Sequence, residues 1–394
     1  MKLARRLDHI EPFYVMECAK AAQAIAASPA CDPALGGEPM IYLNIGEPDF
    51  SAPPLVQEAA ERAIRAGRTQ YTQATGLPAL REALSAWYRQ RFGLDVAAER
   101  IVITAGASAA LQLACLALFE AGDEVLMPDP SYPCNRHFVA AAEAVARLLP
   151  TGAEQRFQLD AQAVAQAWGP ATRGVLLASP SNPTGTSIHP DEMRRIHQLV
   201  RSHDGALIVD EIYLGLSYDE AFGQSALQFG DDIVSVNSFS KYFNMTGWRL
   251  GWLVLPPALV APVERLAQNL FICASTVAQQ AALACFHPES IAEYERRRLE
   301  FRARRDLVVP ALQALGLAVP VQPDGAFYAW ADCRAHHADS WDFAFELMQR
   351  AHVALTPGRD FGRHDPQHWL RLSFATARPQ LEEALHRLQR VLGG

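Results

Sequence analysis

The sequence predicts an α/β fold in which a large domain, built on a mostly parallel sheet sandwiched by helices, is joined to a smaller α+β domain. Short apolar runs alternate with helical stretches between residues 100 and 255. A long charged helix follows at about 288–315, and the remaining residues have the pattern of a small α+β unit. Strands that are apolar along their whole length and lie between helices are typical of a parallel sheet buried on both faces.

The segments before residue 100 are mainly helical. The Ala-rich segment 12–27 is expected to form a helix that ends before Pro29, and residues 53–66 and 77–92 also have helical periodicity. Between these helices, IYLNIGEPDF (41–50) predicts a short extended run followed by a Gly-Glu-Pro-Asp turn.

The alternating region supplies the sheet. Its helices are expected at 107–119, 132–142 and 191–203, and its strands at 101–104, 124–128, 174–180, 206–213, 232–240 and 250–255. The helix at 288–315 is interpreted as a tether between the domains, and the arginine-rich stretch in its middle (296–306) as a solvated face. The predicted large domain is then 50–288, and the small domain is 1–49 together with 289–394.

Length and composition exclude several classes of protein. The 394 residues, half of them apolar, are enough for a large core. The net charge of −8 comes without any block of Lys or Arg, so we expect no nucleic-acid partner. No apolar run reaches about 18 residues, and the first residues lack the pattern of a targeting peptide. A cytoplasmic protein without a membrane span is therefore expected.

Cysteines and histidines do not suggest a metal site. The seven cysteines are widely spaced and form no C-x-x-C pair, so we expect reduced thiols, mostly in the core. The histidine pairs at 336/337 and 364/368 are interpreted as surface residues, because no second cluster completes a set of ligands.

Lysine is scarce in this chain. Only three of the 35 basic residues are lysine: Lys2, Lys20 and Lys241. Arginine keeps its proton, whereas lysine loses its proton when the surroundings lower its pKa. Lys2 and Lys20 lie near the N-terminus, where a solvated surface position is expected. The internal Lys241 is therefore the candidate for chemistry.

Lys241 lies in the segment SFSKYFNMTGWRLGW (238–252), directly after a predicted strand. Open α/β sheets bind ligands at the carboxyl ends of their strands. The hydroxyls of Ser238 and Ser240 and the guanidinium of Arg249 suit a phosphate, and the amine suits a Schiff base. A serine hydrolase with a lysine base also uses Ser-x-x-Lys, but its Ser-Asp-Asn and Lys-Thr-Gly motifs are absent from the sequence.

Two further strand ends carry polar side chains. In VDEIY (209–213), Asp210 either caps the next helix or keeps a proton on a pyridine nitrogen. In SPSNPTG (179–185), Asn182 either serves the turn or donates its amide to a phenolic oxygen. The residues alone leave both choices open.

Three more segments complete the candidate site. TAGASAAL (104–111) places a helix start after a strand, and the free N–H groups there form an anion site. A dinucleotide or nucleotide triphosphate site is not expected, since G-x-G-x-x-G and a P-loop lysine are absent. Tyr132 either stacks on a flat ring or belongs to the core. Arg371 lies in a short apolar strand, and if buried it needs a partner such as a substrate carboxylate.

Together and in this order, these segments resemble the class I aminotransferase family of fold-type I pyridoxal-5′-phosphate (PLP) enzymes. The resemblance covers about residues 40–376 and rests on NIGEPDF, YTQATGLPALREAL, SPSNPTG, DEIY and SFSKYFNMTGWRLGW. It implies a seven-stranded sheet, PLP as the cofactor, and a ping-pong transfer of an amino group between an amino acid and a 2-oxo acid.

The resemblance also implies a role for each candidate residue. Lys241 forms the Schiff base and moves the proton, Asp210 pairs with the pyridine nitrogen, and Tyr213 binds the phenolic oxygen. The other implied contacts are Asn182 to the same oxygen, Tyr132 to the ring, Ala107, Ser108, Ser238, Ser240 and Arg249 to the phosphate, and Gly46, Asn182 and Arg371 to the substrate carboxylate.

A homodimer with shared active sites is a further implication of the resemblance. Tyr71 matches a family tyrosine that reaches the phosphate in the neighbouring subunit. The segment NLFICAS (269–275) matches a stretch that crosses the interface.

Some relatives that act on dicarboxylates carry a lysine where this chain has Ser108. The chain has no obvious lysine to replace it, though an arginine could serve. We therefore expect substrates with neutral, apolar or aromatic side chains, and Phe13, Tyr14 and Phe271 as lining residues.

Two other functions remain open on the same cofactor. A carbon–sulfur β-lyase or related lyase would have a nearly identical cofactor site. A non-catalytic PLP-sensing regulator domain usually follows a DNA-binding module, but only about 40 residues precede NIGEPDF here.

Overall fold

A seven-stranded sheet forms the centre of the computed structural model, which describes residues 2–12 and 14–393. Its strand order is β2-β8-β7-β6-β5-β3-β4. β8 runs antiparallel to both of its neighbours, and the other neighbouring pairs are parallel, which confirms the predicted sheet. The strands are β2 (Ile101–Thr104), β3 (Glu124–Asp129), β4 (Val145–Pro150), β5 (Thr172–Ala178), β6 (Ala206–Asp210), β7 (Val234–Ser238) and β8 (Gly251–Val254).

Both faces of the sheet are buried in separate apolar clusters. Successive side chains of a strand point to opposite faces, so Leu207 and Val209 of β6 join one cluster and Ile208 joins the other. This arrangement explains why the strands are apolar along their whole length.

Eight helices belong to the part of the chain that contains this sheet. They are α2 (Pro54–Arg65), α3 (Pro78–Phe92), α4 (Ala107–Leu118), α5 (Pro133–Ala141), α6 (Ala161–Ala167), α7 (Pro190–Ser202), α8 (Pro257–Leu270) and α9 (Thr276–Ala282). Five of them begin with proline, which loses no hydrogen bond at the first helical position and has a backbone angle already suited to the helix.

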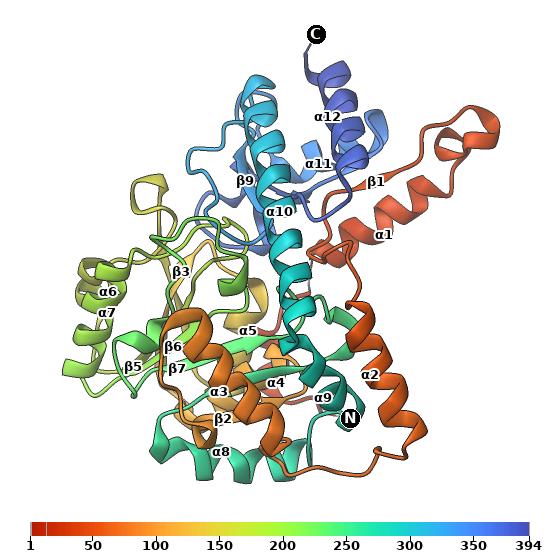
Figure 1. The fold of residues 1–394 in the computed structure, drawn as a ribbon. Helices are drawn as coiled ribbons and strands as arrows, with labels where there is room; N and C mark the ends of the chain where they lie inside the picture. The colour runs from red at the N-terminus through yellow and green to blue at the C-terminus, as the bar shows by residue number, and fades with distance from the viewer. Residues whose placement is uncertain (1, 13, 394) are drawn as a thin grey trace.

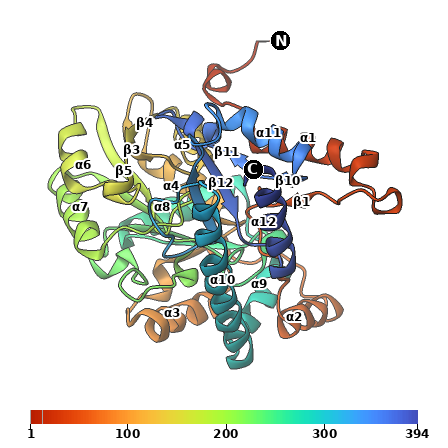
Figure 2. The ribbon, with the colours of Figure 1, turned by 90° about the horizontal axis from the view of Figure 1, so that it is seen from above.

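The long helix α10 (Pro288–Ala314) leads from the sheet to the second group of elements (Figure 1). That group contains an antiparallel sheet in the order β11-β12-β9, made of β9 (Tyr328–Asp332), β11 (Thr356–Pro357) and β12 (Trp369–Ser373). With it lie α11 (Ser340–Arg350), α12 (Arg378–Leu392), α1 (Tyr14–Ala26) and the pair β1 (Ile41–Tyr42) and β10 (Val353–Ala354). Figure 2 shows α1 and the loop after it reaching outward beside this group. The division into domains at 50–288 stays a prediction.

The interpretation of 296–306 as a solvated helix face is wrong for two of its arginines. Arg304 and Arg305 of α10 are buried. Arg304 donates to Asp49 (2.9 and 3.1 Å) and to the carbonyl of Ala375 (2.9 Å). Periodicity could not reveal these partners, because both lie far from Arg304 in the sequence.

The predicted helices end close to their observed ends, whereas the strands differ more. The strands predicted at 206–213 and 232–240 already end at Asp210 and Ser238. β4 was not predicted, because it lies at the edge of the sheet and alternates between exposed and partly buried residues.

The exposed lysines and the free cysteines agree with the predictions made from composition. Lys2 and Lys20 are exposed, as expected. All seven cysteines are free thiols and five are buried, which confirms the expectation for them. Across 2–12 and 14–393, no helix is both long enough and apolar enough to span a membrane. Within the same described ranges, no His, Cys, Asp or Glu side chains are grouped to hold a metal ion.

Candidate active site

A cavity of about 410 Å³ lies where the carboxyl ends of β5, β6 and β7 meet the second group of elements. A volume of this size is typical of a small-molecule site. Twelve of the thirteen predicted site residues line it: Gly46, Ala107, Ser108, Tyr132, Asn182, Asp210, Tyr213, Ser238, Ser240, Lys241, Arg249 and Arg371.

The Lys241 amine lies inside this cavity. Its Nζ donates to the carbonyl of Gly46 (2.7 Å) and lies 5.7 Å from the ring centres of Tyr213 and Phe327. Burial lowers the pKa of Lys241 to about 8, an effect that Glu47 opposes and Arg371 reinforces. A larger fraction of the amine is therefore neutral near pH 7 than in an exposed lysine, and the neutral amine is the nucleophilic form.

Asp210, the last residue of β6, lies in the same cavity and is only 3% exposed. Its carboxylate accepts from the N–H of Ile212 (3.2 Å). Burial raises the pKa of this carboxyl to about 7. The alternative that Asp210 caps the next helix is wrong, since the 3-10 helix that follows has Tyr213 as its N-cap. A cationic ligand atom would offset the cost of burying this carboxylate.

The start of α4 forms an anion cradle with Arg249. Gly106 precedes the helix at φ +86°, and a Cβ there would lie 2.8 Å from the Arg249 guanidinium. The first N–H groups of a helix have no partner within it, and the helix dipole favours negative charge at that end. Ser238 and Ser240 line the same cavity. Backbone donors, hydroxyls and a guanidinium together suit a phosphate.

Arg371 of β12 is a buried cation. It is 4% exposed and donates to Asn182 Oδ1 (2.9 Å) and to the carbonyl of Asn44 (2.7 Å), while its Nε has no partner. It forms no ion pair with any residue among 2–12 and 14–393. A buried charge without a counterion is costly, so Arg371 provides a site for an anionic ligand. Since the Asn182 oxygen accepts from Arg371, the Asn182 amide NH₂ is the group that remains to donate.

Sequence reasoning missed part of the lining. Val15, Met16 and Ala19 of α1 line the cavity, as does Tyr328. Asp360, distant in sequence, holds the start of α1 by accepting from the N–H groups of Tyr14 (2.8 Å) and Val15. These contacts depend on tertiary packing, and no local motif signals them. Further apolar lining residues are Ile45, Leu111, Ala178, Pro180 and Ile212.

Three further residues predicted near the site lie outside the cavity, and a fourth lies outside the described residues. Tyr71 lies outside the cavity with 79% of its side chain exposed, so its role at a second subunit stays a prediction. Neither Tyr14 nor Phe271 lines the cavity. The Tyr14 ring packs edge-on against Trp341, and Phe271 packs against one of the two apolar clusters that flank the sheet. Phe13 lies outside the described residues.

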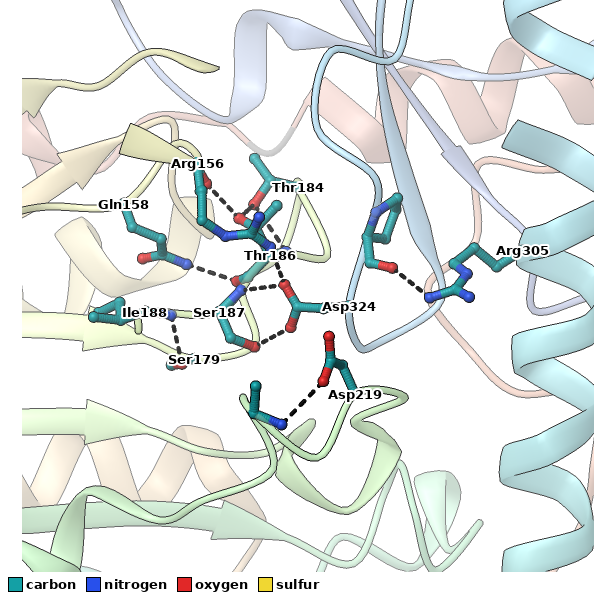
Figure 3. Close-up of polar contacts among 12 residues, drawn as sticks. Arg156, Gln158, Ser179, Thr184, Thr186, Ser187, Ile188, Asp219, Arg305 and Asp324 are labelled. Atoms are coloured by element: carbon teal, nitrogen blue, oxygen red, sulfur yellow. Dashed lines mark hydrogen bonds and ion pairs between the residues drawn. The ribbon is translucent and has the colours of Figure 1, made fainter. Parts of the chain in front are cut away.

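The loop that carries Asn182 is held by Asp324 (Figure 3). Asp324 is 5% exposed and accepts from Arg156 (2.6 Å), from the N–H of Ser187 (2.9 Å) and from the Ser187 hydroxyl. Its own N–H donates to Gly185 (3.0 Å). These bonds fix Gly185 and Ser187, which follow Asn182 in this loop.

Replacing Asp324 with asparagine is expected to lower the free energy of unfolding by about 1–3 kcal/mol, because an NH₂ group would then face donors. Chemical denaturation measures the change. Asp219→Asn is the matched control, since this exposed turn residue only accepts from the N–H of Ala221 and asparagine keeps that bond. Equal stability of the two variants would contradict the role of Asp324.

Known proteins are similar to this chain in sequence and in fold. The family model for aminotransferase class I and II matches residues 38–388. A valine–pyruvate aminotransferase of Mycobacterium tuberculosis is 39% identical over 380 residues, 96% of each chain. A crystal structure of an aminotransferase from that organism has a TM-score of 0.94 at 38% identity, covering 100% of this chain and 99% of that one. Thermus thermophilus aspartate aminotransferase, solved with maleate, has a TM-score of 0.90 at 33% identity, with both chains fully covered.

The family match extends over most of the chain and includes every segment that lines the cavity except α1. It confirms the resemblance found in the sequence motifs. The chain belongs to the aminotransferase class I and II family.

Proposed function

We propose that this PLP-dependent aminotransferase moves an amino group between an amino acid with a neutral, apolar or aromatic side chain and a 2-oxo acid. The observation that carries the proposal is the placement of two cations in one cavity. Lys241 supplies an amine with a lowered pKa, and Arg371 supplies a buried guanidinium without a counterion. An amino acid or oxo acid brings the carboxylate that Arg371 lacks.

The residues present fit PLP, the cofactor of this family. The α4 cradle, with Ser238, Ser240 and Arg249, suits its phosphate, and Asp210 suits its pyridine nitrogen. When bound, PLP supplies an aldehyde that condenses with amines and a protonated ring that accepts electrons. The other proposed contacts are Tyr132 to the ring, and Asn182 and Tyr213 to the phenolic oxygen.

Arg371, Lys241 and Asp210 then have distinct tasks in the proposed reaction. Arg371 binds the substrate carboxylate and so orients the bond between the α-carbon and its proton. Lys241, once free, takes up that proton and returns it at the other reacting carbon, which requires a pKa near the working pH. Asp210 holds the proton on the ring nitrogen, as a carboxylate buried beside a cation does.

The surroundings of the substrate side chain support a neutral substrate. Val15, Met16, Ala19, Ile45 and Leu111 are apolar. Among the described lining residues, the only Lys or Arg side chains are Lys241, Arg249 and Arg371, and all three are assigned to other groups. The valine–pyruvate relative acts on a neutral amino acid, whereas the aspartate aminotransferase binds a dicarboxylate.

Steady-state assays with a panel of amino acids test this preference. We expect kcat/KM for valine, leucine or phenylalanine to exceed that for aspartate at least about tenfold, because a carboxylate in an apolar site lacks a partner. Ser108→Lys is expected to narrow this ratio of kcat/KM values by about tenfold, since a hydrogen bond to a charged group contributes about 1.5–3 kcal/mol and about 1.4 kcal/mol corresponds to a factor of ten. Faster turnover of aspartate by the unmodified enzyme would contradict the preference. Release of ammonia and oxo acid without any acceptor would indicate a lyase instead.

A homodimer with shared sites is also proposed. Tyr71, Leu270 and Ile272 are exposed apolar or aromatic residues, and Thr276 donates to the carbonyl of Gln70 (2.6 Å), so their two segments are neighbours. A second copy of the chain would cover this surface and place Tyr71 at the partner's phosphate. A one-chain mass in analytical ultracentrifugation would contradict the dimer. The cytoplasmic location stays a prediction from the sequence.

A further inference from the structure

Tyr328 takes no part in the proposed reaction, yet it lines the active-site cavity. It is the first residue of β9, is 1% exposed, and lines the cavity. Its hydroxyl lies 2.8 Å from the hydroxyl of Tyr213, and the two rings meet edge to face with centres 5.7 Å apart. The two tyrosines are 115 residues apart in the sequence, so only the fold brings them together.

The position of the Tyr328 hydroxyl is fixed from several sides. A Cβ at Gly46 would lie 2.3 Å from it, so the hydroxyl fits only because residue 46 is glycine. The carbonyl of the same Gly46 accepts a hydrogen bond from the Lys241 amine (2.7 Å). The Arg371 guanidinium lies 4.5 Å from the Tyr328 ring centre, where a cation is attracted to the ring face. Tyr328 therefore lies beside Gly46, which binds the Lys241 amine, and beside the Arg371 guanidinium.

The direction of the bond between the two hydroxyls follows from counting protons. One hydroxyl donates and the other accepts, and each has a single proton. The proposed function requires Tyr213 to donate to the phenolic oxygen of the cofactor, so Tyr213 has to accept from Tyr328. A hydroxyl that accepts a hydrogen bond becomes a stronger donor, because such chains polarise one another.

We propose that Tyr328 is a positioning residue that donates to Tyr213 and directs the Tyr213 proton to the phenolic oxygen of PLP. The proposal rests on the proposed function and extends it to a residue that contacts Tyr213 rather than the phenolic oxygen. It makes Tyr328 and Tyr213 a two-member donor chain that ends on the cofactor.

A measurable consequence concerns the linkage between Lys241 and the cofactor. When the linkage nitrogen loses its proton, the phenolic oxygen keeps its negative charge and loses the positive charge of that nitrogen. A stronger donor stabilises this deprotonated form and lowers the pKa of the linkage. Tyr328→Phe leaves Tyr213 a weaker donor and is therefore expected to raise that pKa by about half a unit.

The test is a pH titration of the visible absorbance of the PLP-loaded enzyme. Tyr213→Phe is expected to raise the linkage pKa by about one unit or more, since a charge-assisted bond is lost. Because Tyr328 acts through Tyr213, the double variant should titrate like Tyr213→Phe alone. Tyr218→Phe is the matched control. Tyr218 is another buried tyrosine, whose hydroxyl donates to the carbonyl of Ala326 outside the cavity, and its loss should not move the pKa.

Two results would overturn the proposal while the proposed function stands. One is an unchanged linkage pKa in Tyr328→Phe when Tyr213→Phe shifts it. The other is a full additional shift in the double variant, which would mean that Tyr328 acts independently of Tyr213. Absence of the linkage absorbance from the loaded unmodified enzyme would overturn the proposed function itself, and the role of Tyr328 with it.

Discussion

Replacing Lys241 with arginine is expected to lower kcat/KM by at least about 10³-fold and to remove the absorbance of the linkage between the enzyme and PLP. Arginine keeps a positive charge and a similar length, so the electrostatics of the cavity change little. It keeps its proton, however, and so provides neither the nucleophile nor the proton carrier, each of which contributes a large factor to the rate. The measurements are steady-state kinetics with the best substrate and the absorbance spectrum.

The control for this variant is Lys20→Arg, which makes the same change at an exposed lysine. It should retain the activity of the unmodified enzyme. Since Arg371 and the phosphate cradle are intact in Lys241→Arg, the variant should still bind PLP in equilibrium dialysis. A rate within tenfold of the unmodified enzyme would contradict the assignment of Lys241.

Replacing Asp210 with asparagine is expected to lower kcat/KM by about 10²-fold. The amide has nearly the same shape and can still accept from Ile212, but it carries no charge to hold a proton on the pyridine nitrogen. A carboxylate beside a cation shifts the pKa of its partner by about 1–3 units, which corresponds to this range of rates. Initial rates at amino-donor concentrations well below KM measure the loss of kcat/KM.

In Asp210→Asn, we expect activity to fall without a loss of stability. Asp210 is buried and its pKa is raised to about 7, so the isolated carboxylate is unfavourable before the cofactor binds. The free energy of unfolding without PLP should therefore stay equal or rise in Asp210→Asn while activity falls. Asp219→Asn, at an exposed turn, should change neither quantity. Unchanged activity of Asp210→Asn would exclude the proposed pairing with the ring nitrogen.

The sequence reveals this site well because several of its motifs lie at or just after the carboxyl ends of strands. Asp210 and Ser238 are the last residues of β6 and β7, and parallel strands bring their carboxyl ends to one edge. A motif that follows an apolar run is therefore already placed in space. The order of the motifs then gives the family, and the family gives the roles.

Residues that act across the fold could not be found in this way. Tyr328 reaches Tyr213 from a different sheet, and Arg304 reaches Asp49 from the middle of a helix that looks solvated. Met16 reaches the cavity from α1, whose start is held by Asp360. Each of these contacts joins distant segments, and neither periodicity nor turn chemistry carries information about them.

The most direct test of the central claim is the absorbance of the PLP-loaded enzyme during a single half-reaction. One neutral amino acid is added without any oxo acid, and 2-oxoglutarate is added afterwards. An aminotransferase loses the visible band to the shorter-wavelength band of the aminated cofactor, and the oxo acid restores it. A visible band that persists, or continuous release of ammonia before any acceptor is present, would contradict transamination as the reaction of this enzyme.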